Sequence, residues 1–316
     1  MRPRCFVLAA ALATSATATA TAAEWKHYVG TINGNVPITA DLRFDDTGVS
    51  GVYRYNRVGT AIPLQFKART SPPEAMSSWT LEEFGEPDSG RKPTGVWSLQ
   101  LEMDWSTLQG TWTSPDGATS FPLVLRENYV GAAHVGEASL SADGEDEGWT
   151  AHVTLLFPTE PAAAFTAFRQ SSEAQLLKGG FFDRIPDRNE LCEELKLLPM
   201  GERSGDQLLY NGDGVLSVGT DSLSYSCGQK SFLDQTFRSI DLATGRTLQW
   251  YDFVRPEGEA LLNRLLPEGS VRDLGPPGVD GHGIWFAAGM SLVEHYSVHI
   301  PWKDLAGYTT GHPITR

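Results

Sequence analysis

Two histidines have a spacing that could bind a metal ion. His295 and His299 are four positions apart, and on a helix this spacing would allow both imidazoles to bind one zinc ion. Residues 292–302 instead alternate as a strand, in which positions four apart lie about 13 Å from each other. His282 lies between two glycines, which is typical of an exposed turn. We therefore expect no metal site at these histidines.

Serines and acidic pairs form only incomplete catalytic motifs. Ser217 lies within Gly214–Gly219, whose glycine spacing differs from that of the G-x-S-x-G nucleophile elbow. The pairs Glu82–Glu83 and Glu193–Glu194 could supply an acid and a base, but their neighbours predict solvated surfaces. Asn211–Gly214 lacks the further acidic ligands of a calcium loop, and a tight turn explains it better. The sequence thus predicts no catalytic residue and no cofactor, and it leaves open a site assembled from distant residues.

The first residues have the order of a secretory signal peptide. Arg2 and Arg4 precede an apolar run over 5–13, and a stretch of small residues ends in Ala20-Thr21-Ala22. A charged region, a short apolar region and a small-residue cleavage site define such a leader. The apolar run is shorter than the ~20 residues that span a bilayer. We expect a leader over 1–23 and a periplasmic or secreted mature protein without a transmembrane segment.

The chain is acidic. It carries 25 Lys and Arg against 39 Asp and Glu, a formal net charge of −14, and loss of Arg2 and Arg4 with the leader makes it more negative. Such a surface repels nucleic acid and anionic lipid. The charge therefore argues against nucleic acid as a partner. It would attract a basic partner, although an acidic balance more often serves only solubility.

Two cysteines remain after the leader, which contains Cys5. Cys192 and Cys227 have no C-x-x-C spacing and thus no sign of redox chemistry. In an oxidising compartment an isolated pair favours a disulfide, and two free buried thiols are the alternative. We predict a disulfide between Cys192 and Cys227.

Residues 24–128 are expected to be mainly β. Within 36–44 every second residue is apolar, which predicts a half-buried strand. Eight such runs are separated by turn sequences such as Asn33-Gly34 and Asp116-Gly117. They predict an eight-stranded antiparallel meander that forms a small barrel or a rolled sheet. Four tryptophans either line a ligand cavity there or fill the interior, namely Trp79, Trp97, Trp105 and Trp112.

The rest of the chain changes character. Residues 129–149 are rich in glycine and acids, which predicts a solvated connector. Residues 150–316 mix helix and strand patterns and predict an α+β domain with a mainly antiparallel sheet. The expected helices cover 161–178, a stretch after Pro186 and 256–266, and the expected strands cover 215–227, 232–242, 284–288 and 292–302.

The C-terminal half resembles a bacterial extracytoplasmic domain of unknown function. That domain ends some peptidoglycan deacetylases and forms the outer part of lysozyme-sensing anti-sigma factors. The similarity rests on residues 239–248 (SIDLATGRTL), the helix at 256–266 and the closing stretch 289–305. It implies a cell-envelope setting and a binding role. The sequence contains neither a membrane helix after the leader nor a deacetylase domain, so signalling and deacetylation are not implied, and the N-terminal half resembles no family.

These observations favour a non-catalytic cell-envelope binding protein, with cell-wall glycan or a basic wall-degrading enzyme as the partner. Two alternatives remain open. One is a hydrolase of envelope polymers with a distributed active site, and the other is a small-ligand carrier that uses the barrel. A cleft with converging histidines and carboxylates would favour the hydrolase, and an open, dry barrel would favour the carrier.

Overall fold

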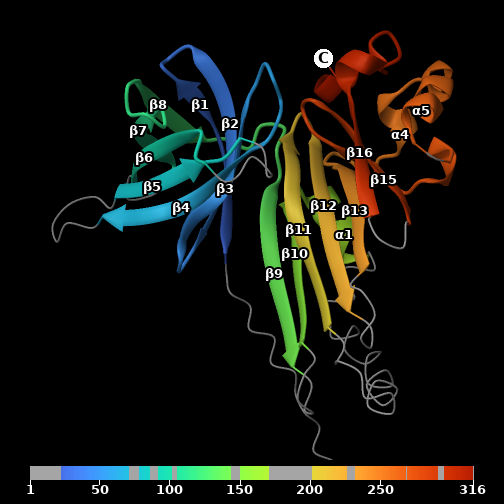
Figure 1. Cartoon of the computed structure of the whole chain (residues 1–316), viewed down its shortest axis with the longest axis horizontal. Helices are drawn as coiled ribbons and strands as arrows, with labels where there is room; N and C mark the ends of the chain where they lie inside the picture. The colour runs from blue at the N-terminus through green and yellow to red at the C-terminus, as the bar shows by residue number, and fades with distance from the viewer. Residues whose placement is uncertain are drawn as a thin grey trace, which may run out of the picture.

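The computed structural model describes residues 23–70, 78–85, 92–101, 105–143, 150–170, 201–225, 232–267, 269–290 and 295–315. A closed barrel at the N-terminal end lies beside an assembly of two sheets and short helices (Figure 1). Residues 1–22 of the expected leader, both cysteines of the predicted disulfide and the helix expected after Pro186 lie outside the described residues. None of the helices within those ranges has the length and apolar character needed to cross a membrane.

Strands β1 to β8 form the barrel in chain order, and antiparallel pairing of β1 with β8 closes it. Their bounds are β1 Glu24–Ile32, β2 Val36–Asp45, β3 Gly48–Tyr55, β4 Ile62–Thr70, β5 Ser78–Glu83, β6 Gly95–Leu101, β7 Thr107–Thr113 and β8 Ser120–Glu127. Each strand pairs with the next, which confirms the predicted eight-stranded meander. Of the two forms that the sequence allowed, the closed barrel is the one present, and closure removes the unpaired edges of an open sheet.

Inward-facing apolar side chains fill the barrel. Trp97 is fully buried and Trp79 is 5% exposed, within a core cluster to which every strand contributes. Trp105 and Trp112 are partly buried and pack against this cluster. The four tryptophans therefore lie in and around the apolar core of the barrel.

Glu83 corrects one expectation about acidic surfaces. Alternate positions of β5 are buried, so Glu83 faces inward with Trp79 and Leu81. Its Oε2 accepts hydrogen bonds from the Tyr53 hydroxyl at 2.7 Å and from Trp112 Nε1 at 2.8 Å. Burial and the Glu83 carboxylate raise the pKa of Tyr53, which keeps its hydroxyl protonated as a donor. The solvated surface predicted for Glu82–Glu83 is thus wrong for Glu83.

A five-stranded sheet in the order β13-β12-β11-β10-β9 forms the centre of the second part. Its elements are β9 His134–Asp143, β10 Thr150–Glu160, α1 Ala162–Arg169, β11 Gly201–Gly212, β12 Val215–Tyr225 and β13 Phe232–Asp241. Neighbours are antiparallel except β10 and β11, which are parallel. The connection between these two strands contains α1, because parallel neighbours require a crossover. The predicted α+β character is therefore present.

Strand β9 runs through the stretch 129–149, which the sequence predicted to be a connector. It pairs with β10 along its length, Val135 is buried, and the side chain of Glu137 is only 4% exposed. The connector prediction is wrong for these residues. Composition misled it because pairing with the next strand, β10, satisfies the backbone of a glycine-rich, acidic segment.

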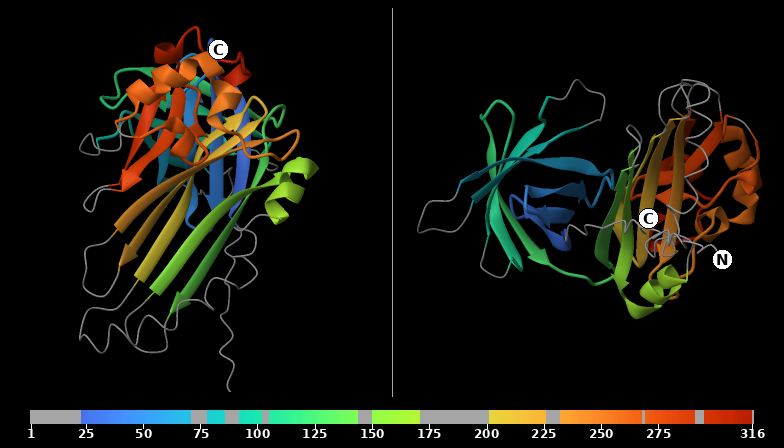
Figure 2. Two further views of the ribbon diagram at one scale, coloured as in Figure 1. Left: turned by 90° about the vertical axis from the view of Figure 1, so that its right-hand side faces the viewer. Right: turned by 90° about the horizontal axis from the view of Figure 1, so that it is seen from below.

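A three-stranded sheet, β14-β15-β16, and short helices complete the chain. Their bounds are α4 Trp250–Phe253, η3 Pro256–Gly258, α5 Glu259–Leu265, η4 Val271–Asp273, β14 Gly278–Val279, β15 Gly283–Met290, β16 His295–Pro301, η5 Trp302–Leu305 and η6 Pro313–Thr315. A shared apolar core joins these elements. Figure 2 shows the five-stranded sheet between the barrel and these C-terminal elements.

A buried polar network joins the barrel to the five-stranded sheet. In the barrel, Asp41 accepts a hydrogen bond from Arg54 Nη1 at 3.0 Å and lies 2.7 Å from His27 Nδ1. From the sheet, Asn211 Nδ2 donates to Asp41 Oδ1 at 3.0 Å, and the Leu209 carbonyl accepts from Arg54 Nη2 at 2.7 Å. Burial by itself raises the pKa of Asp41, but His27 and Arg54 lower it below its ordinary value. The network therefore fixes the barrel against the sheet through a charged carboxylate.

Candidate functional site: a pocket between barrel and sheet

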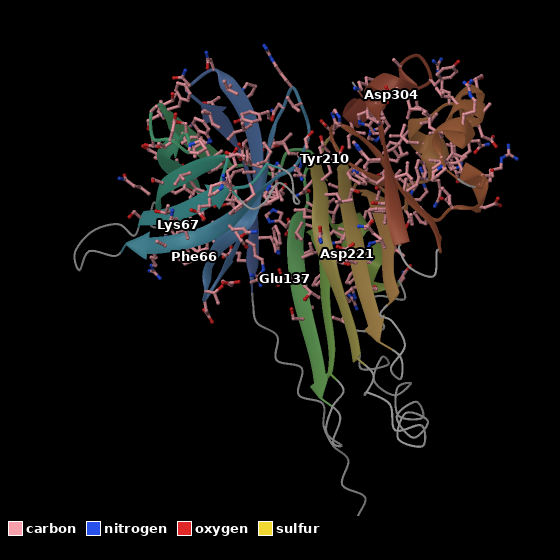
Figure 3. All side chains as sticks on the ribbon, viewed as in Figure 1. Phe66, Lys67, Glu137, Tyr210, Asp221 and Asp304 are labelled. Carbon is pink, nitrogen blue, oxygen red and sulfur yellow. The ribbon has the colours of Figure 1, made fainter. Side chains whose placement is uncertain are left out.

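A pocket of about 390 Å³ lies where the barrel meets the five-stranded sheet. Its volume falls within the range of about 300–1,000 Å³ that is typical of small-ligand sites. Six strands line it with Trp25, Arg43, Glu137, Thr154, Leu156, Gly205, Asp206, Gln207 and Asp221. In Figure 3, Glu137 lies on the side of the sheet nearest the barrel, and Asp221 lies farther from the barrel. The lining combines an aromatic ring with planar polar and charged groups.

Trp25, Arg43 and Glu137 form the wall at the barrel. Trp25 and Arg43 are directly opposite each other in β1 and β2. Both side chains therefore reach Glu137 on the five-stranded sheet. Glu137 Oε2 accepts from Trp25 Nε1 at 2.8 Å and from Arg43 Nε at 2.6 Å, and its Oε1 accepts from Arg43 Nη2 at 2.8 Å. This hydrogen bonding raises the pKa of Arg43. A bidentate pair of this kind holds both planar groups in one orientation.

The pocket lies where β10 and β11 separate. The backbone pairing of β10 with β11 ends at Thr154 and Gly205. Beyond that point, the backbone of β10 is hydrogen-bonded to side chains. Asp206 Oδ2 accepts from the Leu156 amide at 2.8 Å, and the Leu156 carbonyl accepts from Arg238 Nη2 at 3.0 Å. A Cβ atom added at Gly205 would meet no heavy atom within 4 Å. Gly205 therefore borders open space, although the backbone around it is hydrogen-bonded.

Asp221 contributes a carboxylate that has no ion pair among the described residues. Its Oδ2 accepts from Gln207 Nε2 and its Oδ1 from Gln235 Nε2, both at 2.7 Å. The other two carboxylates of the lining each have an arginine within 4 Å. The two amides orient the Asp221 carboxylate without neutralising it, so the lining retains an uncompensated negative charge.

The residues considered from sequence lie elsewhere. The four barrel tryptophans are absent from the pocket lining. Ser217 is fully buried, and its Oγ accepts from the Val279 amide at 2.9 Å and from the Ser239 hydroxyl at 3.0 Å. Asn211 is part of the network around Asp41. Ser217 and Asn211 therefore connect parts of the fold.

The fold places His282 and His299 next to each other, although no sequence pattern connects them. The rings of His282 and His299 are 5.4 Å apart, and His299 Nε2 lies 3.5 Å from Asp280 Oδ1. His295 and His299 lie on β16, which is the strand that the sequence predicted for them. Within the described ranges there is no group of three or more His, Cys, Asp or Glu residues suited to a metal ion.

Asp280 holds the turn before β15. Its Oδ1 accepts from the amides of His282 and Gly283 at 2.7 Å, and its Oδ2 accepts from Trp285 Nε1 at 2.9 Å. Burial raises the pKa of Asp280, but the nearby His299 ring and the hydrogen bond from Trp285 lower it below its ordinary value. Because the pKa of Asp280 is lower in the folded protein than its unfolded value of about 3.9, the ionised side chain stabilises the fold at pH values above about 3.9. This stabilisation is lost as the pH falls through the folded pKa.

Replacing Asp280 with asparagine should therefore weaken the acid sensitivity of the protein. We expect the unfolding free energy of Asp280→Asn to depend less on pH below about pH 4, by at most ~1.4 kcal/mol per pH unit. Urea unfolding at stepwise lower pH measures this. Asp304→Asn, at an exposed position, is the control and should follow the parent. Equal slopes for parent and Asp280→Asn would show that Asp280 has the same pKa folded and unfolded.

Comparison with known proteins finds no matching family model and no matching curated protein. Six chains of solved structures match. A DUF3298 family member from Bacteroides fragilis NCTC 9343 has 12% identity and a TM-score of 0.47, over 60% of this chain and 98% of its own. A DUF3298 family protein from Pseudomonas aeruginosa PAO1 has 12% identity and a TM-score of 0.38, over 57% of this chain and 95% of its own. DUF3298 is a bacterial domain family of unknown function.

Proposed function

We propose that this chain is a non-catalytic binding protein of the cell envelope that holds cell-wall glycan in the pocket between barrel and sheet. The lining of that pocket is the observation that carries the proposal. The expected leader and the resemblance of the C-terminal half to domains of wall-modifying and wall-sensing proteins support the envelope setting. They also support glycan as the class of ligand.

The chemistry of the lining suits a saccharide. A sugar ring offers an apolar face of C–H groups and an edge of hydroxyl groups. Trp25 supplies a large ring whose orientation is held by Glu137, and such a ring packs well against an apolar face. Arg43, Gln207 and Thr154 add donors and acceptors for hydroxyl groups. A few polar groups of fixed orientation beside an aromatic surface are typical of ligand sites.

The pocket is a better candidate site than the barrel interior, because the side chains of the barrel core fill that interior. Within the pocket, Asp206 accepts from the Leu156 amide and from the Thr220 hydroxyl at 2.6 Å. Glu137 is held by Arg43 and Trp25. These contacts assign both carboxylates a role in shaping the site, which favours binding over acid–base chemistry.

Filling the pocket at Gly205 should abolish glycan binding. The added ring of Gly205→Phe would occupy the open space beside Gly205, and phenylalanine is well tolerated in strands. We expect soluble muropeptides to bind the parent and to lose at least about tenfold in affinity in this variant, measured by isothermal titration calorimetry.

Gly275→Phe is the matched control. Gly275 also has no heavy atom within 4 Å of an added Cβ, and it lies outside the pocket. Its variant should bind as the parent does, and thermal unfolding should confirm that both variants fold. Muropeptide binding that survives Gly205→Phe would place the site elsewhere. Binding of lysozyme by a parent protein that ignores muropeptides would make a basic protein the partner instead.

A further inference from the structure

Asp221 is the carboxylate of the pocket lining that has no ion pair among the described residues. We infer that the pocket selects sugars with a free, protonated amino group over the same sugars in N-acetylated form. This inference rests on the proposed glycan function and names its substrate class. The observation behind it is the combination, in one cavity, of the Trp25 ring and a carboxylate that lacks an ion pair among the described residues.

The hydrogen-bonding capacity of Asp221 leaves room for a ligand. An ionised carboxylate has about four lone-pair sites, and Gln207 and Gln235 together use two of them. An ammonium group carries three donors and no acceptor. It can therefore use the remaining sites on Asp221 and neutralise the charge at the same time. Hydrogen bonds between two ionised groups are about twice as strong as those between neutral groups.

The rest of the lining increases this preference. Its charged side chains are three carboxylates and one guanidinium, and that guanidinium is committed to Glu137. A cation entering the cavity therefore meets a negative environment. An N-acetyl group is neutral, so its single N–H can donate to Asp221 but leaves the negative charge of the lining in place. Because an ammonium group adds ion pairing and further donors to such a hydrogen bond, we expect at least about a tenfold difference in affinity.

The test uses two ligands that differ in their acetyl groups. Chitotetraose in fully N-acetylated form and its fully deacetylated counterpart are titrated into the parent protein at about pH 6, where an aliphatic amine is protonated. The deacetylated tetramer should bind at least about tenfold tighter at low salt. The difference in affinity between the two tetramers should become smaller at about 0.5 M salt, because salt shortens the distance over which exposed charges attract each other.

Asp221→Asn provides the second measurement, since asparagine keeps the shape of the side chain and removes its charge. In this variant the two tetramers should bind within about twofold of each other, and the N-acetylated tetramer should bind as it does to the parent. Asp304→Asn removes one carboxylate at an exposed position away from the pocket (Figure 3). This control should keep the full preference for the amine.

The outcomes separate the two proposals. Equal binding of both tetramers by the parent overturns this inference and leaves the glycan function standing. A preference for the amine that persists in Asp221→Asn also overturns it, because the charge would then act from elsewhere. If neither tetramer nor any muropeptide binds the parent, the glycan function and this inference both fail. The comparison of the two tetramers uses the parent protein, so that part of the test does not depend on the folding of a variant.

Discussion

Replacing Asp41 with alanine should lower the free energy of unfolding by about 3–5 kcal/mol, which is typical when one member of a buried ion pair is removed. The variant would leave Arg54, only 2% exposed, without its carboxylate. His27 and Asn211 would lose the same acceptor. Urea unfolding followed by fluorescence measures the change, with the slope of the transition as a check on compactness.

Asp304→Ala is the control for this experiment. Its side chain is exposed, and exposed substitutions usually change stability by less than about 0.5 kcal/mol. A loss for Asp41→Ala no larger than that of the control would contradict the network as the connection between barrel and sheet. Because Asn211 and Arg54 reach Asp41 and Leu209 across the junction, the variant should also weaken muropeptide binding at the pocket beside it.

Trp97→Ala should lower the free energy of unfolding by about as much as Asp41→Ala. The side chain is fully buried in the barrel core, and large aromatic residues cost about 3–5 kcal/mol when reduced to alanine in a packed core. Trp97 Nε1 has no hydrogen-bond partner among the described residues. Trp97→Phe removes that unpaired donor and keeps most of the ring volume, so it should cost less than half as much as Trp97→Ala.

The two tryptophan variants also decide between the filling and ligand-lining roles. If the barrel held a ligand cavity against Trp97, enlarging that cavity would change the stability of the ligand-free protein little. Urea unfolding of ligand-free Trp97→Ala within about 1 kcal/mol of the parent would therefore favour the carrier. A large loss for alanine with a small one for phenylalanine would support a packed core.

The eight barrel strands were predictable because their signal is local. Alternation along each strand and turn sequences such as Asn33-Gly34 are properties of a few neighbouring residues. The choice between a closed barrel and a rolled sheet was not local, since it depends on whether β1 reaches β8. The same limit explains Glu83. Its charge suggested solvent, and only the phase of β5 and the donors from Tyr53 and Trp112 allow it to face inward.

The pocket escaped prediction for a related reason. Its nine residues come from six strands between positions 25 and 221, and none of them forms a motif with its neighbours in sequence. Glu137 lies in a segment whose composition suggested a connector, and its role depends on Trp25 and Arg43 from the barrel. Asp221 resembles any surface aspartate until the structure shows which groups surround it.

The sequence by itself determined the strand pattern of the barrel, the mixed character of the second half and the acidic charge of the chain. These follow from composition and from periodicities that each segment carries alone. Tertiary structure decided the closure of the barrel, the inclusion of β9 in the sheet and the position of the pocket. Closure of the barrel and the pocket depend on contacts between residues far apart in the chain, as do the contacts of Glu137 on β9 with Trp25 and Arg43. The loss of chain entropy in forming such contacts is balanced only by the whole fold.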